Sequence, residues 1–153
     1  MTLKILIILS AFMALTTTPS VSDKVDITGH WEGTITRDEG GGKRTTFEMR
    51  LDVLQRGKKI TGISYAGFEN DNKKYFAKFD ITGKISGSYF KFTENKILNA
   101  DSIPHATWCI KKADLIYRKP KDVETLEGIW EGVAEGGECM PGRIFLQKKP
   151  PRV

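Results

Sequence analysis

Hydrophobic and polar residues alternate with a period of two along most of the chain. The clearest stretch is TFEMRLDV, in which Phe47, Met49, Leu51 and Val53 fall on one face and the residues between them are polar. A period of two is typical of a β-strand with one face buried and the other in water. The pattern therefore predicts an all-β domain, and no amphipathic helix is predicted within it.

Short polar turn signals separate the alternating runs. They contain Gly, Asn or Asp, which tolerate the positive φ angles of tight turns, and they are DEGGGK at 38–43, RGKK at 56–59, ENDNKK at 69–74 and TGK at 82–84. Because short links join neighbours, successive strands are expected to pair antiparallel in chain order. Eight strands are predicted, over residues 27–36, 45–55, 59–66, 74–82, 84–93, 106–118, 125–134 and 143–149.

The pentapeptide GHWEG at 29–33 returns as GIWEG at 128–132, close to the other end of the predicted domain. Alternation directs Trp31 and Trp130 inward, each with a glycine two residues to either side. Glycine beside an indole leaves space for the ring and lets a strand bend, as the closure of a small barrel requires. The sequence thus predicts a single antiparallel up-and-down eight-stranded β-barrel, with a β-sandwich as the alternative. The predicted closure residues are Gly29, Gly33, Gly128 and Gly132.

The first 22 residues have the features of a signal peptide. Lys4 provides a positive start, residues 5–15 are almost wholly apolar, and small residues precede and include Ser22. The apolar run is shorter than the roughly 20 residues that a membrane span needs. We expect cleavage after Ser22 and a secreted or periplasmic protein with no stable membrane insertion. The expected divisions are a signal peptide at 1–22, a barrel domain at 23–149 and a C-terminal tail at 150–153.

Two cysteines, Cys109 and Cys139, remain in the predicted mature chain. An exported chain meets an oxidising environment, and the even count favours a disulfide between them. A zinc site with His30 and His105 is the alternative. The four residues lack the paired spacing of structural zinc ligands, so no metal is expected.

The chain carries a net charge of +5. Its basic residues are scattered among predicted turns and strand ends and form no single stripe with interleaved aromatic residues. Nucleic acid is therefore not an expected partner. The basic clusters are Arg56–Lys59, Lys73–Lys74, Lys111–Lys112 and Lys148–Lys149.

The sequence shows no catalytic constellation. It has two histidines and no G-x-S-x-G, H-E-x-x-H or phosphate-binding glycine motif. Glu32 and Glu131 occupy equivalent places in the repeated pentapeptide, but alternation turns both toward solvent. We expect a protein that is not an enzyme and has no cofactor.

Gly29-x-Trp31 near the start of the first predicted strand, together with the strand count and the mature length, resembles the calycin group of lipocalins and avidins. In lipocalins the tryptophan closes the barrel floor, and a basic residue from near the last strand packs over it. The resemblance implies that role for Arg143, through a cation–π contact. The chain lacks the long helix that follows the last strand of lipocalins, and the inward polar residues that hold biotin in avidins are not recognisable.

An eight-stranded barrel is either filled by side chains or holds one small ligand. The first hypothesis is an exported lipocalin-like protein that binds a small apolar or amphipathic molecule inside the barrel, with Glu94–Pro104 as a lid and Ser86 and Ser88 as polar contacts. The alternative is a filled barrel that serves as a protein-interaction module or protease inhibitor in the periplasm or outside the cell. The candidate pocket residues are Trp31, Phe47, Tyr75, Phe79, Tyr89, Trp108 and Trp130.

Overall fold

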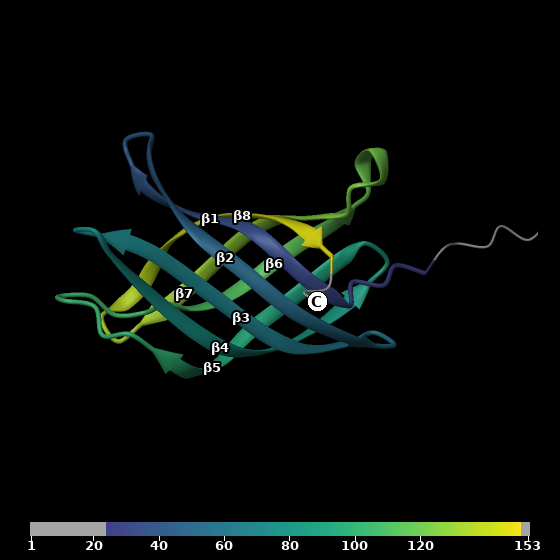
Figure 1. Ribbon diagram of the computed structural model, residues 1–153, viewed down its shortest axis with the longest axis horizontal. Coiled ribbons are helices and arrows are strands. Elements are labelled where there is room, and N and C mark those ends of the chain that lie inside the picture. The colour runs from purple at the N-terminus through teal and green to yellow at the C-terminus, as the bar shows by residue number, and fades with distance from the viewer. Residues whose placement is uncertain (1–23, 151–153) are drawn as a thin grey trace, which may run out of the picture.

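The computed structural model describes residues 24–150, which form one closed barrel of eight antiparallel strands (Figure 1). Each strand pairs with its neighbours in chain order, and the first strand also pairs with the last, from His30 opposite Lys149 to Ile35 opposite Ile144. The predicted up-and-down barrel is therefore confirmed. The predicted signal peptide lies outside the described residues. The strands are β1 (Gly29–Gly40), β2 (Lys43–Arg56), β3 (Lys59–Asn70), β4 (Lys73–Ser86), β5 (Tyr89–Ala100), β6 (Ile110–Arg118), β7 (Thr125–Ala134) and β8 (Gly137–Lys149).

Most strands are longer than predicted because the hairpin turns occupy two residues. The largest difference concerns the predicted turn at residues 82–84, which lies inside β4. The true turn follows at Gly87, which has a φ of 57°. Gly83 instead allows β4 and β5 to approach each other closely, since a Cβ there would lie 2.4 Å from the Lys91 carbonyl oxygen. β5 therefore covers 89–100 instead of the predicted 84–93.

Glycines on the inner face let neighbouring backbones approach where the sheet coils. A Cβ at Gly33 would lie 2.0 Å from the Phe145 carbonyl oxygen, at the seam between β1 and β8. A Cβ at Gly128 would lie 1.9 Å from the Asp114 carbonyl oxygen. Real side chains do not tolerate such contacts, so both positions require glycine, and both belong to the repeated pentapeptide.

The two ends of the barrel differ. The end formed by the β2–β3, β4–β5 and β6–β7 connections, called here the closed end, is entered by residues 25–28. Ile27 is fully buried there; its amide donates to Gln55 Oε1 at 3.0 Å, and its carbonyl accepts the Trp31 indole N–H at 2.9 Å. The connection between β6 and β7 carries a short 3-10 helix, η1 (Pro120–Asp122).

The basic residue over Trp31 is Lys148 and not Arg143 as predicted. The Lys148 Nζ lies 5.5 Å from the Trp31 ring centroid and 3.1 Å from Glu124 Oε1. Ile144 and Leu146 are buried on the inner face of β8, so alternation places Lys148 on that face and Arg143 on the exposed outer face.

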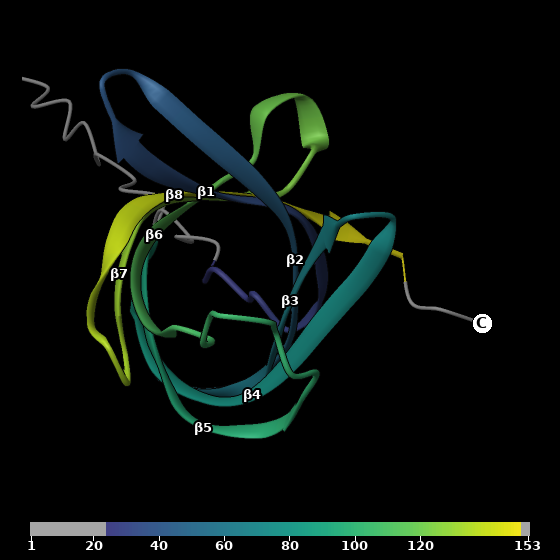
Figure 2. The ribbon, with the colours of Figure 1, turned by 90° about the vertical axis from the view of Figure 1, so that its left-hand side faces the viewer.

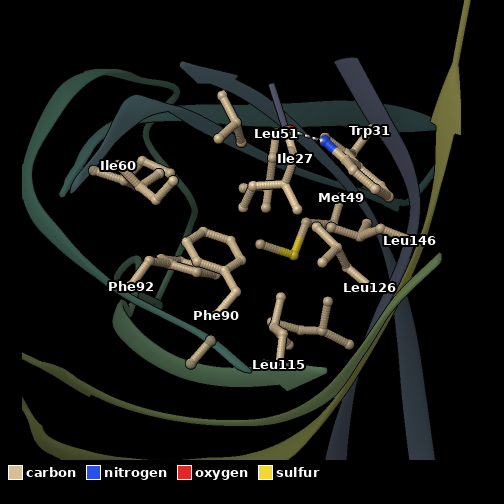
Figure 3. Close-up of a cluster of buried hydrophobic side chains, with 14 of the residues drawn as sticks. Ile27, Trp31, Met49, Leu51, Ile60, Phe90, Phe92, Leu115, Leu126 and Leu146 are labelled. Carbon is tan, nitrogen blue, oxygen red and sulfur yellow. Dashed lines mark hydrogen bonds between the residues drawn. The ribbon is translucent and has the colours of Figure 1, made fainter. Parts of the chain in front are cut away.

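Buried side chains from all eight strands fill the barrel from the closed end to its middle (Figure 3). The largest of them include Trp31, Met49, Phe90 and Leu115, each almost completely buried. A smaller cluster around Ala66, Ala77 and Phe79 lies beyond it. Within residues 24–150, no helix is long and apolar enough to cross a membrane.

Candidate functional site

The opposite end of the barrel, called here the mouth, is formed by the β1–β2, β3–β4 and β7–β8 turns and by residues 101–109 (Figure 2). Just inside it lies a buried ion pair. Glu94 on β5 and Lys111 on β6 are 0% and 4% exposed, and Glu94 Oε2 lies 2.9 Å from Lys111 Nζ. Ser64 Oγ donates to Glu94 Oε1 at 2.7 Å. Two opposite charges and a hydroxyl are thus held together inside the barrel.

Backbone groups complete this polar cluster. The Lys111 amide donates to Glu94 Oε2 at 2.9 Å, and the Lys111 ammonium donates to the Cys109 carbonyl oxygen at 3.0 Å. Both carboxylate oxygens therefore accept hydrogen bonds. Cys109 is joined by a disulfide to Cys139 on β8, as predicted from the sequence, so a covalent bond holds the chain just before Lys111.

The sequence analysis missed both charged residues although alternation contains the signal. Lys111 has the same parity as Ala113 and Leu115, which face inward on β6. Glu94 has the same parity as the buried Phe90 and Phe92 on β5. Charged residues are seldom fully buried, so the sequence by itself favours an exposed basic cluster for Lys111 and a loop for Glu94.

Five aromatic side chains from four segments lie together above the ion pair and form what we call the mouth belt. Phe68 is its centre: the Phe68 ring centroid lies 5.8 Å from that of Phe47, 5.2 Å from that of Tyr75 and 5.6 Å from that of Trp108. Trp108 also packs edgewise on Phe79 at 6.5 Å. The mouth belt consists of Phe47, Phe68, Tyr75, Phe79 and Trp108.

A cation lies at each end of the mouth belt. Lys111 Nζ is 4.1 Å from the Phe79 ring centroid, and the Arg37 guanidinium carbon is 5.5 Å from the Phe47 ring centroid. Cations over aromatic faces are attracted by the ring quadrupole. Lys73 Nζ also lies 5.0 Å from the Tyr75 ring centroid. The interior side of the mouth is therefore an apolar, aromatic surface bounded by three positive charges.

Arg37 belongs to a second polar cluster at the rim. Its Nη2 lies 2.7 Å from Glu39 Oε1, which also accepts a hydrogen bond from the Thr45 hydroxyl. Hydrogen bonds from Arg37 and then Thr45 lower the pKa of Glu39 to about 2. Among the described residues, Arg37 Nε is buried and has no hydrogen-bond partner. The Arg37 side chain as a whole is 43% exposed, so the guanidinium lies at the edge of the mouth.

The segment that crosses the mouth is 101–109 and not the predicted Glu94–Pro104, because β5 continues to Ala100. Asp101 holds its beginning: the Asp101 amide donates to the Phe76 carbonyl oxygen at 2.9 Å, and the Asp101 carboxylate accepts from the Phe76 amide at 2.8 Å. The Trp108 indole N–H donates to the Asp101 carbonyl oxygen at 2.8 Å. Trp108 thus links this segment to the mouth belt.

The predicted pocket residues fall into three groups. Phe47, Tyr75, Phe79 and Trp108 meet in the mouth belt. Trp31 and Trp130 belong to the main core cluster, Trp31 near the closed end and Trp130 at the middle of β7. Tyr89 is 62% exposed on the outer face, which contradicts its predicted inward direction; the shifted turn moves it to the face opposite Phe90.

The proposed polar contacts Ser86 and Ser88 lie at the β4–β5 turn, which is at the closed end. Ser86 is exposed, and neither serine reaches the mouth. The carboxylates of Glu32 and Glu131 are not brought together either. β8 separates their strands, and Gln147, the β8 partner of Glu32, pairs on its other side with Thr125, six residues before Glu131.

His30 faces outward, as alternation predicts, and sits between two carboxylates. Its Nδ1 lies 2.5 Å from Asp52 Oδ1, and its Nε2 lies 2.7 Å from Glu32 Oε1. Burial lowers the pKa of His30, but the hydrogen bonds to Asp52 and Glu32 outweigh it, so the pKa is raised above 6.5. Within residues 24–150, no group of three or more His, Cys, Asp and Glu side chains is arranged to hold a metal ion.

Comparisons of the chain with protein-family models, curated protein sequences and solved structures found no match. The eight-stranded meander is consistent with the calycin-like architecture expected from Gly29-x-Trp31.

Proposed function

We propose that this protein is a non-enzymatic, exported binding barrel that takes one small amphipathic molecule at its mouth. The apolar part of the molecule packs against the mouth belt, and its acidic or polar end points toward Arg37 or Lys111. The observation that carries the proposal is the ion pair of Glu94 and Lys111, buried with Ser64 beneath aromatic side chains.

A buried ion pair is weak support for stability, because apolar residues of similar size often serve a core as well or better. Small-molecule sites, in contrast, combine an apolar aromatic lining with a few placed polar groups. The mouth has that composition, whereas the core nearer the closed end is almost wholly apolar. This difference supports binding at the mouth and not deep in the barrel.

The partial exposure of the side chains at the mouth also supports entry of a ligand from this end. Phe47, Phe68 and Trp108 are only partly buried, whereas the core around Trp31 is closed to solvent. A ligand that displaces Trp108 and residues 101–109 leaves that core intact. Export is supported by the disulfide, since such bonds persist in oxidising compartments, and by the predicted signal peptide at 1–22.

The test is a titration of residues 23–153 with 8-anilinonaphthalene-1-sulfonate, an anionic aromatic dye, followed by dye and tryptophan emission. We expect saturable binding to one site, competed by dodecanoate, and at least about tenfold weaker in Phe68→Ala because the central ring of the mouth belt is lost. Leu54→Ala, on the outer face, is the matched control and should bind as the unmodified protein does.

Dye also binds partly unfolded proteins, so near-ultraviolet circular dichroism must show native packing in each variant. Absence of dye binding by the folded, disulfide-intact protein would overturn the proposal. Equal weakening by Phe68→Ala and Leu54→Ala would also overturn it, since binding would then not depend on the mouth.

A filled barrel that acts as a protein-interaction module or protease inhibitor is the second candidate. It is favoured by Phe76 on β4 and Phe145 on β8, which are 40% and 42% exposed and border one outer-face hollow of about 620 Å³. An inhibition assay against serine and cysteine proteases tests it. Inhibition that Phe76→Ser/Phe145→Ser abolishes would support this function, and intact inhibition by the double variant would contradict the assignment to this face.

A further inference from the structure

Four cations from four neighbouring strands stand directly opposite one another on the outer face near the closed end. Arg56 on β2 pairs with Lys59 on β3, Lys59 pairs with Lys84 on β4, and Lys84 pairs with Lys91 on β5. All four side chains are exposed. We call Arg56, Lys59, Lys84 and Lys91 the basic row.

The composition of the basic row is unfavourable for the fold alone. Like charges directly opposite each other on adjacent strands are destabilising, and the row contains three such pairs. No Asp or Glu occurs in residues 53–68 or 81–93, which make up the two hairpins that carry the row. Asp114 on β6, at one end of the row, forms an ion pair with Lys91 at 3.1 Å. The other three cations, Arg56, Lys59 and Lys84, have only cations as cross-strand partners within the row.

The surface beside the basic row is hollow. Lys59, Lys84 and Lys91 line a depression of about 1020 Å³ that continues over β6, β7 and β8 to Arg143. The carboxylates of Asp38, Asp114 and Glu131 line the same depression, outside the cation–cation pairs of the basic row. Three threonines in direct cross-strand register lie in the same depression, one row nearer the middle of the barrel. They are Thr61, Thr82 and Thr93.

We propose that the basic row binds a linear anionic polysaccharide, whose charged groups lie against the cations and whose hydroxyls bond the threonines. Adjacent strands are about 4.8 Å apart, so the row presents a cation at each step along a line of about 14 Å. Three of its four cations, Lys59, Lys84 and Lys91, line the depression, and a hollow fits an extended chain better than a flat membrane. Tyr89, exposed beside Lys91, offers one ring for packing against a sugar.

The outer face favours a polysaccharide over single-stranded nucleic acid. Proteins that bind such strands without sequence preference stack successive bases on several aromatic side chains. In the hairpin segments 54–61 and 82–93, Tyr89 is the one exposed ring, since Phe90 and Phe92 point into the core. The site lies at the opposite end from the mouth and does not depend on the function proposed above.

The experiment measures binding of a short dextran sulfate to the disulfide-intact protein by calorimetry at several salt concentrations. Lys59→Gln/Lys84→Gln should weaken binding by about tenfold or more, and the slope of log K against log salt should fall by about two, because each cation releases about one counterion. Neutral dextran should not bind.

The matched control is Lys74→Gln/Lys96→Gln, which removes the same charge from positions whose cross-strand partners are the acidic Glu69 and Asp80. It should change binding by less than about twofold if the site is local. Equal losses in the two double variants would overturn the proposal, because binding would then follow net charge alone. No binding of dextran sulfate by the unmodified protein at low salt would also overturn it.

A stability measurement separates a binding role from a structural one. Lys59→Gln/Lys84→Gln should be as stable as the unmodified protein or more stable, because it relieves repulsion. A loss of stability would mean that the row supports the fold. Tighter binding of oligothymidylate, or of phosphatidylglycerol vesicles, through the same two lysines would overturn the polysaccharide as the occupant.

Discussion

Glu94 and Lys111 face each other inside the barrel, with Glu94 Oε2 2.9 Å from Lys111 Nζ and almost no exposure of either side chain. They lie between two different environments, the apolar core that fills the barrel toward the closed end and the partly buried mouth belt. Removing one partner leaves a single charge in the interior, whereas removing both leaves a cavity that apolar atoms can fill. The two residues are therefore expected to be coupled strongly.

The first prediction concerns that coupling. Lys111→Met should lower the free energy of unfolding by about 3–5 kcal/mol, because Glu94 is left as an uncompensated buried charge. Glu94→Leu/Lys111→Met should recover most of this loss. Urea unfolding with the disulfide intact measures both, and a double variant as unstable as the single one would show that the charges are not coupled. The recovered double variant should bind the anionic dye more weakly if Lys111 serves the ligand.

The second prediction concerns the disulfide between Cys109 and Cys139, which are 30 residues apart. On the loop-entropy account, Cys109→Ser/Cys139→Ser should lower the free energy of unfolding by about 3–4 kcal/mol. Cys109 lies between Trp108 and Lys111, so the mouth should loosen first. Hydrogen exchange should then rise at residues 101–111 more than at β2. Uniform exchange across the barrel would contradict a local effect at the mouth.

The third prediction concerns pH. The folded-state pKa of His30 is raised above 6.5, its ordinary value. A raised pKa means that the stabilisation from protonated His30 is fully present below about pH 6.5 and is lost as the pH rises through the folded pKa. The free energy of unfolding should therefore fall as the pH is raised above 6.5. His30→Gln should flatten this dependence, and an unaltered profile in His30→Gln would contradict the assignment.

The architecture could be predicted because alternation and glycine placement are local signals. A period of two indicates strands, and the glycines beside Trp31 and Trp130 mark strands that approach closely, as the seam at Gly33 shows. Turn chemistry was less reliable: Gly83 resembles a turn residue but serves strand contact. A shift by one residue exchanges the two faces of a strand. A turn at 82–84 therefore predicts an inward Tyr89 and a strand that ends before Glu94, whereas the observed turn after Ser86 turns Tyr89 outward and places Glu94 within β5.

The candidate sites were harder to predict because they depend on cross-strand register. Lys111 stands next to Lys112 in a basic pair that is typical of an exposed surface. Only its spacing of four residues from the buried Leu115 indicates that it faces inward. The basic row has no signal along the chain, since Lys59 and Lys84 are 25 residues apart in sequence and become neighbours only when β3 pairs with β4.

The fourth prediction compares two basic residues of β8: Arg143, which the sequence suggests packs over Trp31, and Lys148, which lies there in the structure. Lys148→Ala should lower the free energy of unfolding by about 1 kcal/mol, because it loses both the cation–π contact with Trp31 and the partly buried ion pair with Glu124. Arg143→Ala, on the exposed outer face of the same strand, should change it by less than about 0.5 kcal/mol. Urea unfolding followed by circular dichroism avoids the tryptophan signal that either change could perturb. Equal losses of unfolding free energy in the two variants would mean that Lys148 has no special part in sealing the closed end. A larger loss in Arg143→Ala would favour Arg143, the residue expected from the sequence.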